Sequence, residues 1–137
     1  MKSGKKYWSD WTPVADQQFE YSLDDIGNRV ETRSGGDENG WNLRAASYRV
    51  NNLNQCTSRT VPGFAEILGA TITSNTVTAN GQTAYRRGEY FRAELSVNNG
   101  SAPVWQSVAV QTNGVTGESG NVFVPKTPEV FWYDADG

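Results

Sequence analysis

The segment FRAELSV at residues 91–97 alternates apolar and polar side chains, and VWQSVAV at residues 104–110 repeats the alternation after an Asn-Asn-Gly turn. A two-residue period is typical of a half-buried β-strand, because successive side chains point to opposite faces of a sheet. The first apolar face comprises Phe91, Ala93, Leu95 and Val97. In the second segment Trp105 lies opposite the face formed by Val104, Gln106, Val108 and Val110. Both segments therefore predict strands.

Turn residues interrupt the neighbouring sequence at short intervals. Asn80-Gly81 separates two strand-like runs, and Gly88 separates two more. Asn-Gly between such runs is a strong hairpin signal, because both central positions of the turn require a positive φ. Residues 70–112 are thus predicted to form a compact antiparallel unit of about five strands, since hairpin pairing is local.

The composition favours strands throughout. Val outnumbers Leu 13 to 5 in the 137 residues, and there are 14 Gly. β-Branched residues favour strands and glycine favours tight turns, whereas no sustained helical stripe of apolar residues occurs. We predict an all-β fold of antiparallel hairpins, with a middle resembling a β-sandwich.

Several functional classes are excluded or disfavoured by composition. Histidine is absent and Cys56 is the single cysteine, so a Ser-His-Asp triad, a histidine-ligated metal site and an intrachain disulfide are excluded. The net charge of −3 and the lack of a basic stripe disfavour nucleic acid as a partner. No apolar run is long enough for a membrane span, and no apolar segment of a signal peptide follows the basic start.

The segments outside the alternating region differ in composition and in the structure they predict. Residues 1–17 are predicted to form a polar, loosely attached lead, and residues 34–40 and 113–120 to form flexible polar loops. The span 61–69 (VPGFAEILG) is the best candidate for a short helical turn. Helix elsewhere is expected to be minor.

An aromatic strand followed by an Asp/Asn turn recurs along the chain. It occurs at residues 19–29 (FEYSLDDIGNR), 48–55 (YRVNNLNQ) and 131–137 (FWYDADG). In such a unit the aromatic side chain packs on the sheet, the Asp or Asn side chain accepts backbone N–H groups, and glycine takes the left-handed position. Recurrent units of this kind indicate a repeat architecture.

These segments resemble successive repeats of the RHS/YD-repeat family of large bacterial proteins. The resemblance covers about residues 19–63 and 121–137, and residues 65–112 instead resemble an immunoglobulin-like β-sandwich module. The domain organisation that follows is a lead at 1–17, YD-repeat-like strands at 18–64, a sandwich-like module at 65–112 and a return to YD-repeat-like strand at 113–137. Because the sequence stops inside a repeat, we expect a fragment of a longer repeat protein.

The family resemblance implies a scaffold whose repeats are not catalytic. It implies a secreted or cell-surface parent protein, with other repeat sheets or the remainder of that protein as partners. Unpaired edge strands of such a sheet invite pairing with another copy, so we also expect a possible homodimer.

The acidic residues are interpreted as turn caps. Asp24 and Asp25 are adjacent, so on a strand they point to opposite faces and do not flank one glycosidic bond. The sequence at 134–137 matches only the first half of an EF-hand calcium loop and lacks the remaining ligands. The oxygen-bearing side chains at 37–39 are interpreted as part of a structural loop. We therefore predict no catalytic residue, no metal site and no cofactor.

Tryptophans supply the alternative function, carbohydrate binding by a β-sandwich. Sugars stack their C–H faces on flat exposed rings while polar side chains fix their orientation. The candidate ligand-binding residues are Trp41, Trp105 and Trp132, with Arg92 and Gln106 as polar partners of Trp105. The competing interpretation is that Trp105 and Trp132 anchor the core.

Overall fold

The computed structural model describes residues 2–134. These residues contain β-strands and no helix, and the strands form three antiparallel sheets, which confirms the predicted all-β class. No helix that could cross a membrane occurs in this described range. The chain divides into two compact units, and residues 63–125 form the second of them. We call the described residues 2–62 and 126–134 the hairpin unit, and residues 63–125 the sandwich unit.

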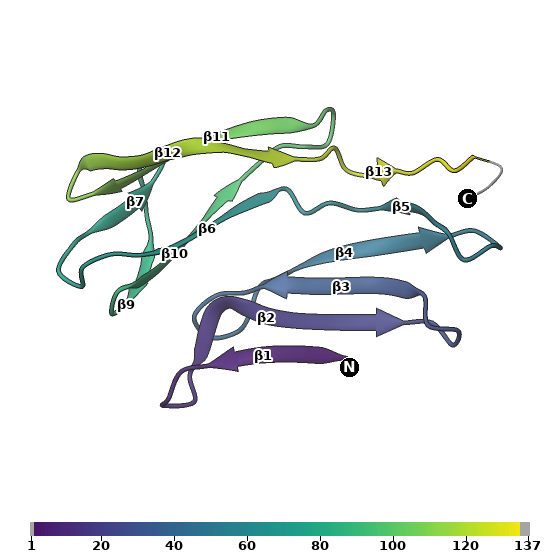
Figure 1. Ribbon diagram of the computed structural model, residues 1–137, viewed down its shortest axis with the longest axis horizontal. Coiled ribbons are helices and arrows are strands. Elements are labelled where there is room, and N and C mark those ends of the chain that lie inside the picture. The colour runs from purple at the N-terminus through teal and green to yellow at the C-terminus, as the bar shows by residue number, and fades with distance from the viewer. Residues whose placement is uncertain (1, 135–137) are drawn as a thin grey trace. The chain divides into compact units, whose positions relative to one another are not determined.

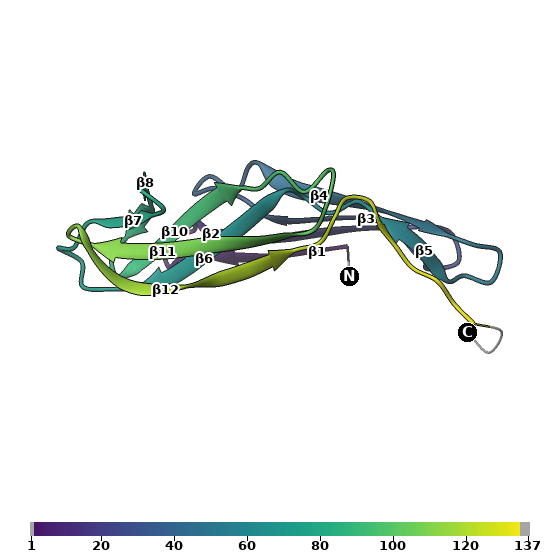
Figure 2. The ribbon, with the colours of Figure 1, turned by 90° about the horizontal axis from the view of Figure 1, so that it is seen from above.

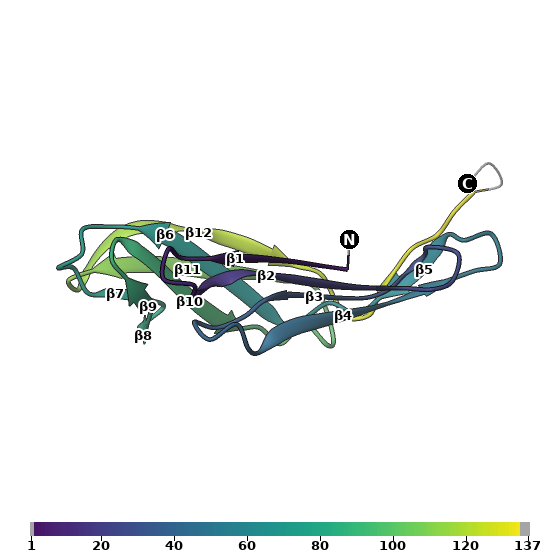
Figure 3. The same ribbon diagram turned by 90° about the horizontal axis from the view of Figure 1, so that it is seen from below.

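The hairpin unit contains one six-stranded sheet in the order β1-β2-β3-β4-β5-β13, and every neighbouring pair is antiparallel. Figures 1 and 3 show β1 to β4 following one another side by side in chain order. The last strand, β13, returns from the sandwich unit to pair with β5. The bounds are β1 Ser3–Tyr7, β2 Pro13–Leu23, β3 Arg29–Gly35, β4 Leu43–Val50, β5 Cys56–Arg59 and β13 Glu129–Val130.

Four consecutive turns of the hairpin unit share one backbone pattern. The first residue donates its N–H to the carbonyl of the fifth, and the fourth donates its N–H to the carbonyl of the first. The fourth residue has a positive φ of 66°, 92°, 75° and 61° in turn order, as in three-residue hairpin loops with a left-handed last residue. The turns are Trp8–Thr12, Asp24–Asn28, Asp37–Trp41 and Asn51–Gln55.

An Asp or Asn side chain caps three of these turns in the same way. Its Oδ1 accepts the backbone N–H groups of the residues two and four positions later, at 2.7–3.1 Å. The predicted capping at 24–28 and 51–55 is confirmed, although Asn54 rather than glycine takes the left-handed position in the second. Asn28 Nδ2 also donates to Asn54 Oδ1 at 3.1 Å, which joins these two turns at one end of the sheet.

The sandwich unit contains two sheets, in the orders β6-β10-β9 and β12-β11-β7-β8. The alternating segments at 91–97 and 104–110 lie in different sheets, in β10 and β11, so the turn at 98–100 crosses between sheets rather than closing a hairpin. Figure 2 shows β11 and β12 side by side. The bounds are β6 Phe64–Ala70, β7 Val77–Ala79, β8 Gln82–Thr83, β9 Tyr85–Arg87, β10 Tyr90–Ser96, β11 Val104–Thr112 and β12 Val115–Val124.

Side chains from both sheets form the core of the sandwich unit. The predicted inward face of residues 91–97 is fully buried, and β11 contributes Val108. The turn at Asn80-Gly81 has the two positive φ values expected of a tight hairpin, 48° and 80°. The buried apolar residues of the unit are Ala65, Val77, Ala79, Ala84, Phe91, Ala93, Leu95, Val97, Val108 and Val124.

Three expectations for local structure were wrong. The span 61–69 forms most of β6, which pairs along its length with β10, so tertiary pairing overrides its local preference. Residues 115–120 are not a loop but part of β12, which follows a second Asn-Gly turn at 113–114. Residues 1–17 are not a loose lead, because they contain β1 and the start of β2, and these two strands pair.

The unit boundaries differ from the expected ones on the C-terminal side. The predicted module at 65–112 lies within the unit at 63–125, because β12 pairs along β11 and belongs to the sandwich unit. The return to the hairpin sheet therefore begins after Pro125. Of the expected repeat at 131–137, residues 135–137 lie outside the described range.

Candidate functional site

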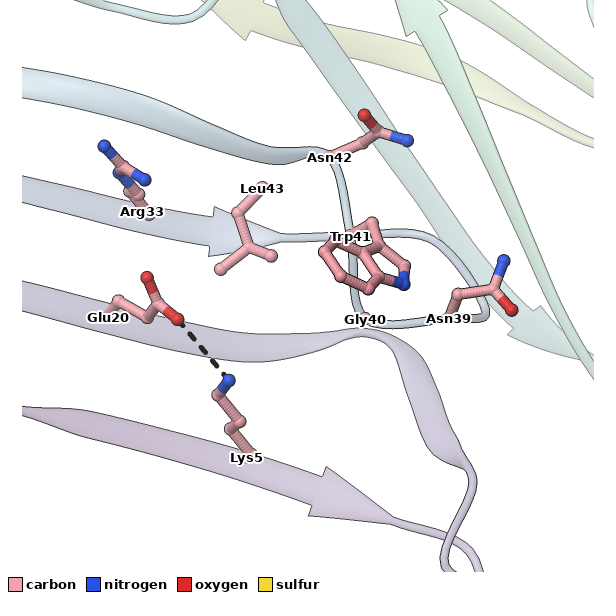
Figure 4. A pocket seen from close by; sticks show the side chains of 8 residues that line it. All are labelled: Lys5, Glu20, Arg33, Asn39, Gly40, Trp41, Asn42 and Leu43. Carbon is pink, nitrogen blue, oxygen red and sulfur yellow. Dashed lines mark ion pairs between the residues drawn. The ribbon is translucent and has the colours of Figure 1, made fainter.

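An open pocket on one face of the hairpin unit gathers an indole and several polar side chains. Its volume is about 490 Å³. Figure 4 shows the Trp41 ring beside Leu43, with Lys5, Glu20 and Arg33 on the neighbouring strands. The lining residues are Lys5, Glu20, Arg33, Asn39, Gly40, Trp41, Asn42 and Leu43.

The turn at 37–41 fixes the backbone of Trp41. Its N–H donates to Asp37 Oδ1 at 3.0 Å and its carbonyl accepts the Asp37 N–H at 2.8 Å. Asn42 Nδ2 donates to the other oxygen of Asp37, Oδ2, at 2.8 Å. The residues on either side of Trp41 have left-handed backbones, with φ of 75° at Gly40 and 59° at Asn42. The indole is thereby held out from the sheet and remains 70% exposed.

Buried polar and glycine residues support the loop beneath the indole. Gln18 is 1% exposed, and its Nε2 donates to the carbonyls of Lys6 and Val14 at 3.0 and 3.1 Å. A Cβ atom at Gly36 would lie 3.1 Å from the Trp41 carbonyl oxygen and 3.7 Å from Gln18 Cγ. The loop can approach β2 this closely because Gly36 has no side chain.

Charged residues continue the polar face along β2 and β3. Glu20 lies opposite Arg33 in the antiparallel register, and Ser22 lies opposite Glu31. Lys5 Nζ is 3.4 Å from Glu20 Oε1, and Arg33 Nε is 2.8 Å from Glu31 Oε1. A second pocket of about 280 Å³ is lined by Glu20, Ser22, Glu31 and Arg33, so it adjoins the Trp41 pocket through Glu20 and Arg33.

The opposite face of the same sheet is aromatic. The Arg29 guanidinium carbon lies 5.7 Å from the ring centroid of Tyr21 and 5.4 Å from that of Tyr48. Burial raises the pKa of Tyr48, but hydrogen bonds with Thr32, Arg29 and Arg59 outweigh burial and lower that pKa overall. This face therefore combines packed rings with cations, whereas the Trp41 face is polar.

The structure leaves all three predicted tryptophans exposed. Trp41 and Trp105 are each 70% exposed and Trp132 is 90% exposed. The interpretation that Trp105 and Trp132 anchor the core is therefore wrong. Trp105 lies against Phe123 on the neighbouring strand, with ring centroids 5.1 Å apart. The three indoles lie in separate segments, and of the two pockets described above only the larger includes a tryptophan, Trp41.

The expected polar partners of Trp105 do not lie beside it. Arg92 lies on β10, in the other sheet, and points away from the core face formed by its neighbours Phe91 and Ala93. Its guanidinium binds both oxygens of Glu66 at 2.8 and 3.0 Å and Glu94 Oε2 at 2.8 Å. Gln106 is on the opposite face of β11 from Trp105. The crossover between the sheets, which the sequence did not reveal, separates Arg92 from Trp105, whereas strand alternation puts Gln106 on the other face of β11.

Sequence reasoning missed the side chains that surround Trp41. The sequence pattern predicts a lead at residues 1–17 and does not give the pairing of β2 with β3, so it does not point to Lys5, Glu20 or Arg33. A signal was present in the Asp-x-Gly-Asn turn at 24–28. Counting outward from that turn pairs β2 with β3 but places Glu20 opposite Thr32, whereas the bulge between Ser22 and Leu23 shifts the register by one residue and brings Arg33 opposite Glu20.

The acidic turn residues are occupied in capping. The side-chain hydrogen bond from Asn28 is the largest cause that lowers the pKa of Asp24; desolvation opposes it, and backbone N–H groups lower the pKa further. Asp37 caps the turn that carries Trp41. Within residues 2–134 no group of three or more Cys, Asp or Glu side chains is arranged to hold a metal ion.

Comparisons with protein-family models, with curated proteins and with solved structures gave no match to this chain.

Proposed function

We propose that this chain is a non-catalytic structural and interaction module of an RHS/YD-repeat protein that is secreted or displayed on a bacterial surface. The observation that carries the proposal is the hydrogen-bond pattern shared by four consecutive turns of the hairpin unit. A sheet assembled from one strand-plus-turn unit used repeatedly is a means of extending a surface. The aspartate side chains at these turns accept backbone N–H groups of the turns, which is a structural role.

The aromatic face of the hairpin sheet supports an interaction role. Phe19 and Leu23 alternate on β2 with Tyr21 and therefore share its face, and they are 37% and 50% exposed. A sheet normally buries its apolar face against another layer. This face is therefore suited to contact other parts of a larger repeat assembly.

The exposed edge strands differ in how well they are protected against pairing. β1 carries Lys5 and Lys6, and lysine on an edge discourages the addition of another strand. β13 has only two residues. β12 is an edge of its sheet, has ten residues and contains one charged residue, Glu118. The other edges of the sandwich unit, β6, β8 and β9, have seven, two and three residues. β12 is the longest edge strand, and we assign self-association of this chain to it.

Light scattering across a wide concentration range tests the proposal. The mass is expected to rise from one chain to two, and Ser119→Lys, at an exposed position in the middle of β12, is expected to restore the monomer. Ser47→Lys is the matched control, because Ser47 is also exposed but lies on the central strand β4 opposite Glu31. A monomeric mass at every concentration, or equal effects of the two variants, would overturn the interaction role.

A further inference from the structure

The two pockets on the hairpin unit share lining residues, and we call their combined surface the Trp41 groove. The pocket that contains Trp41 and the pocket that contains Ser22 and Glu31 share Glu20 and Arg33. In the register of the sheet, Leu43, Gly35, Gln18 and Lys5 form one cross-strand row, and the Arg33 and Glu31 rows follow it. Three such rows span about 13 Å at the usual rise of a strand. This length exceeds that of a single pyranose ring.

The groove combines a flat apolar platform with hydrogen-bonding groups. Trp41 presents its exposed ring at one end, and its backbone is fixed by the turn at 37–41. Glu20 offers carboxylate oxygens, Arg33 offers guanidinium N–H groups and Asn39 offers an amide. A pyranose has an apolar C–H face for stacking and hydroxyl groups that both donate and accept, so it matches this combination.

The charge of the groove favours a neutral ligand. Lys5 is paired with Glu20 and Arg33 with Glu31, so the four formal charges cancel. A polyanion or polycation would find no net attraction here, since steering requires an excess of one sign. Hydroxyl groups, by contrast, can bond to both members of each ion pair without displacing them.

We infer that the Trp41 groove of the hairpin unit binds a neutral oligosaccharide segment of a polysaccharide, with Trp41 as its stacking platform. Trp41 is one of the ligand-binding candidates that the sequence suggested for a carbohydrate-binding sandwich, but it lies on the hairpin unit, whereas Trp105 on the sandwich unit has neither Arg92 nor Gln106 beside it. The Trp41 groove also lies on a different unit from the β12 edge assigned to self-association. The two proposals can therefore fail independently.

Affinity electrophoresis through gels containing neutral glucans, mannans or xylans tests the inference, with an acidic polyuronate as the contrasting polymer. At least one neutral polysaccharide is expected to retard the chain. Trp41→Ala is expected to weaken that retardation at least about tenfold, as loss of a dominant aromatic contact does. Trp105→Ala is the matched control, since both indoles are 70% exposed, and it is expected to leave retardation unchanged.

A second pair of variants guards against misfolding of Trp41→Ala. Glu20→Gln keeps the size of the side chain, and Arg33→Gln shortens the side chain but keeps an amide N–H donor. Each variant is expected to weaken binding by about threefold to tenfold, as loss of one hydrogen-bonding group does. Circular dichroism and melting temperature establish that each variant is folded. Absence of retardation on every neutral polymer, binding to the polyuronate alone, or equal losses in Trp41→Ala and Trp105→Ala would overturn the inference.

Discussion

Gly69 on β6 lies directly opposite Phe91 on β10, and a Cβ atom placed on Gly69 would lie 2.5 Å from Phe91 Cζ. The ring therefore occupies the space that a side chain at residue 69 would need. An aromatic ring packed over a cross-strand glycine covers the backbone that the glycine exposes. Phe91 is itself only 7% exposed and belongs to the core of the sandwich unit.

Gly69→Ala is expected to lower the free energy of unfolding by about 1–3 kcal/mol, because a methyl group in a packed position forces side chains and backbone to shift. Chemical denaturation followed by fluorescence measures the change. Gly120→Ala on β12 is the control, since nothing lies within 4 Å of its Cβ position and its φ is not left-handed. A loss for Gly120→Ala as large as that for Gly69→Ala would contradict the packing argument.

Asn51→Ala is expected to lower the free energy of unfolding by about 1–2 kcal/mol, as the loss of a capping side chain typically does. Asn51 Oδ1 accepts the N–H groups of Leu53 and Gln55 at 2.9 and 3.0 Å, and its Nδ2 donates to Gln55 Oε1. Leu53→Ala removes a side chain that is 76% exposed and is expected to change stability by at most about 0.5 kcal/mol. Equal effects would mean that the cap contributes nothing.

Asp24 is expected to make the stability of the hairpin unit depend on pH. Its folded pKa lies below the ordinary value of 3.8, chiefly because of the hydrogen bond from Asn28. Its contribution is therefore complete above that ordinary value and disappears as the pH falls through the lower, folded pKa. The difference in melting temperature between the wild type and Asp24→Asn should be constant near neutral pH and shrink in acid. A difference that stays constant down to strongly acidic pH would contradict this assignment.

The local sequence pattern was sufficient to predict the fold class and much of the core of the sandwich unit. The alternation at 91–97 predicted the buried face correctly, and Asn80-Gly81 predicted its hairpin, because both signals depend on residues close in sequence. The position of β6 was not predictable in this way. Its strand character comes from pairing with β10, about 26 residues away in the chain.

The candidate site was predicted only at one residue, Trp41. Its exposure follows from a turn whose Asp37 cap is visible in the sequence, but the groove around it depends on the register of three strands. The β-bulges in the pairs β1–β2 and β2–β3 shift that register, and such shifts have no reliable local signal. The crossover between sheets likewise separates Arg92 from Trp105, although the two lie 13 residues apart.

Arg92 is expected to stabilise the sandwich unit rather than bind a ligand. Its side chain is 13% exposed and contacts Glu66 and Glu94, which are 24% and 14% exposed. Arg92→Ala leaves two half-buried carboxylates without this cation, so it should lower the free energy of unfolding by about 2–4 kcal/mol, toward the range for breaking a buried ion pair. Arg33→Ala is the matched control, because the Arg33–Glu31 pair is 52% and 29% exposed and such surface pairs contribute about 0–1 kcal/mol. Denaturation of both variants measures the difference. If Arg92→Ala cost no more than Arg33→Ala, or abolished polysaccharide retardation while leaving stability unchanged, the structural role assigned to Arg92 would be wrong.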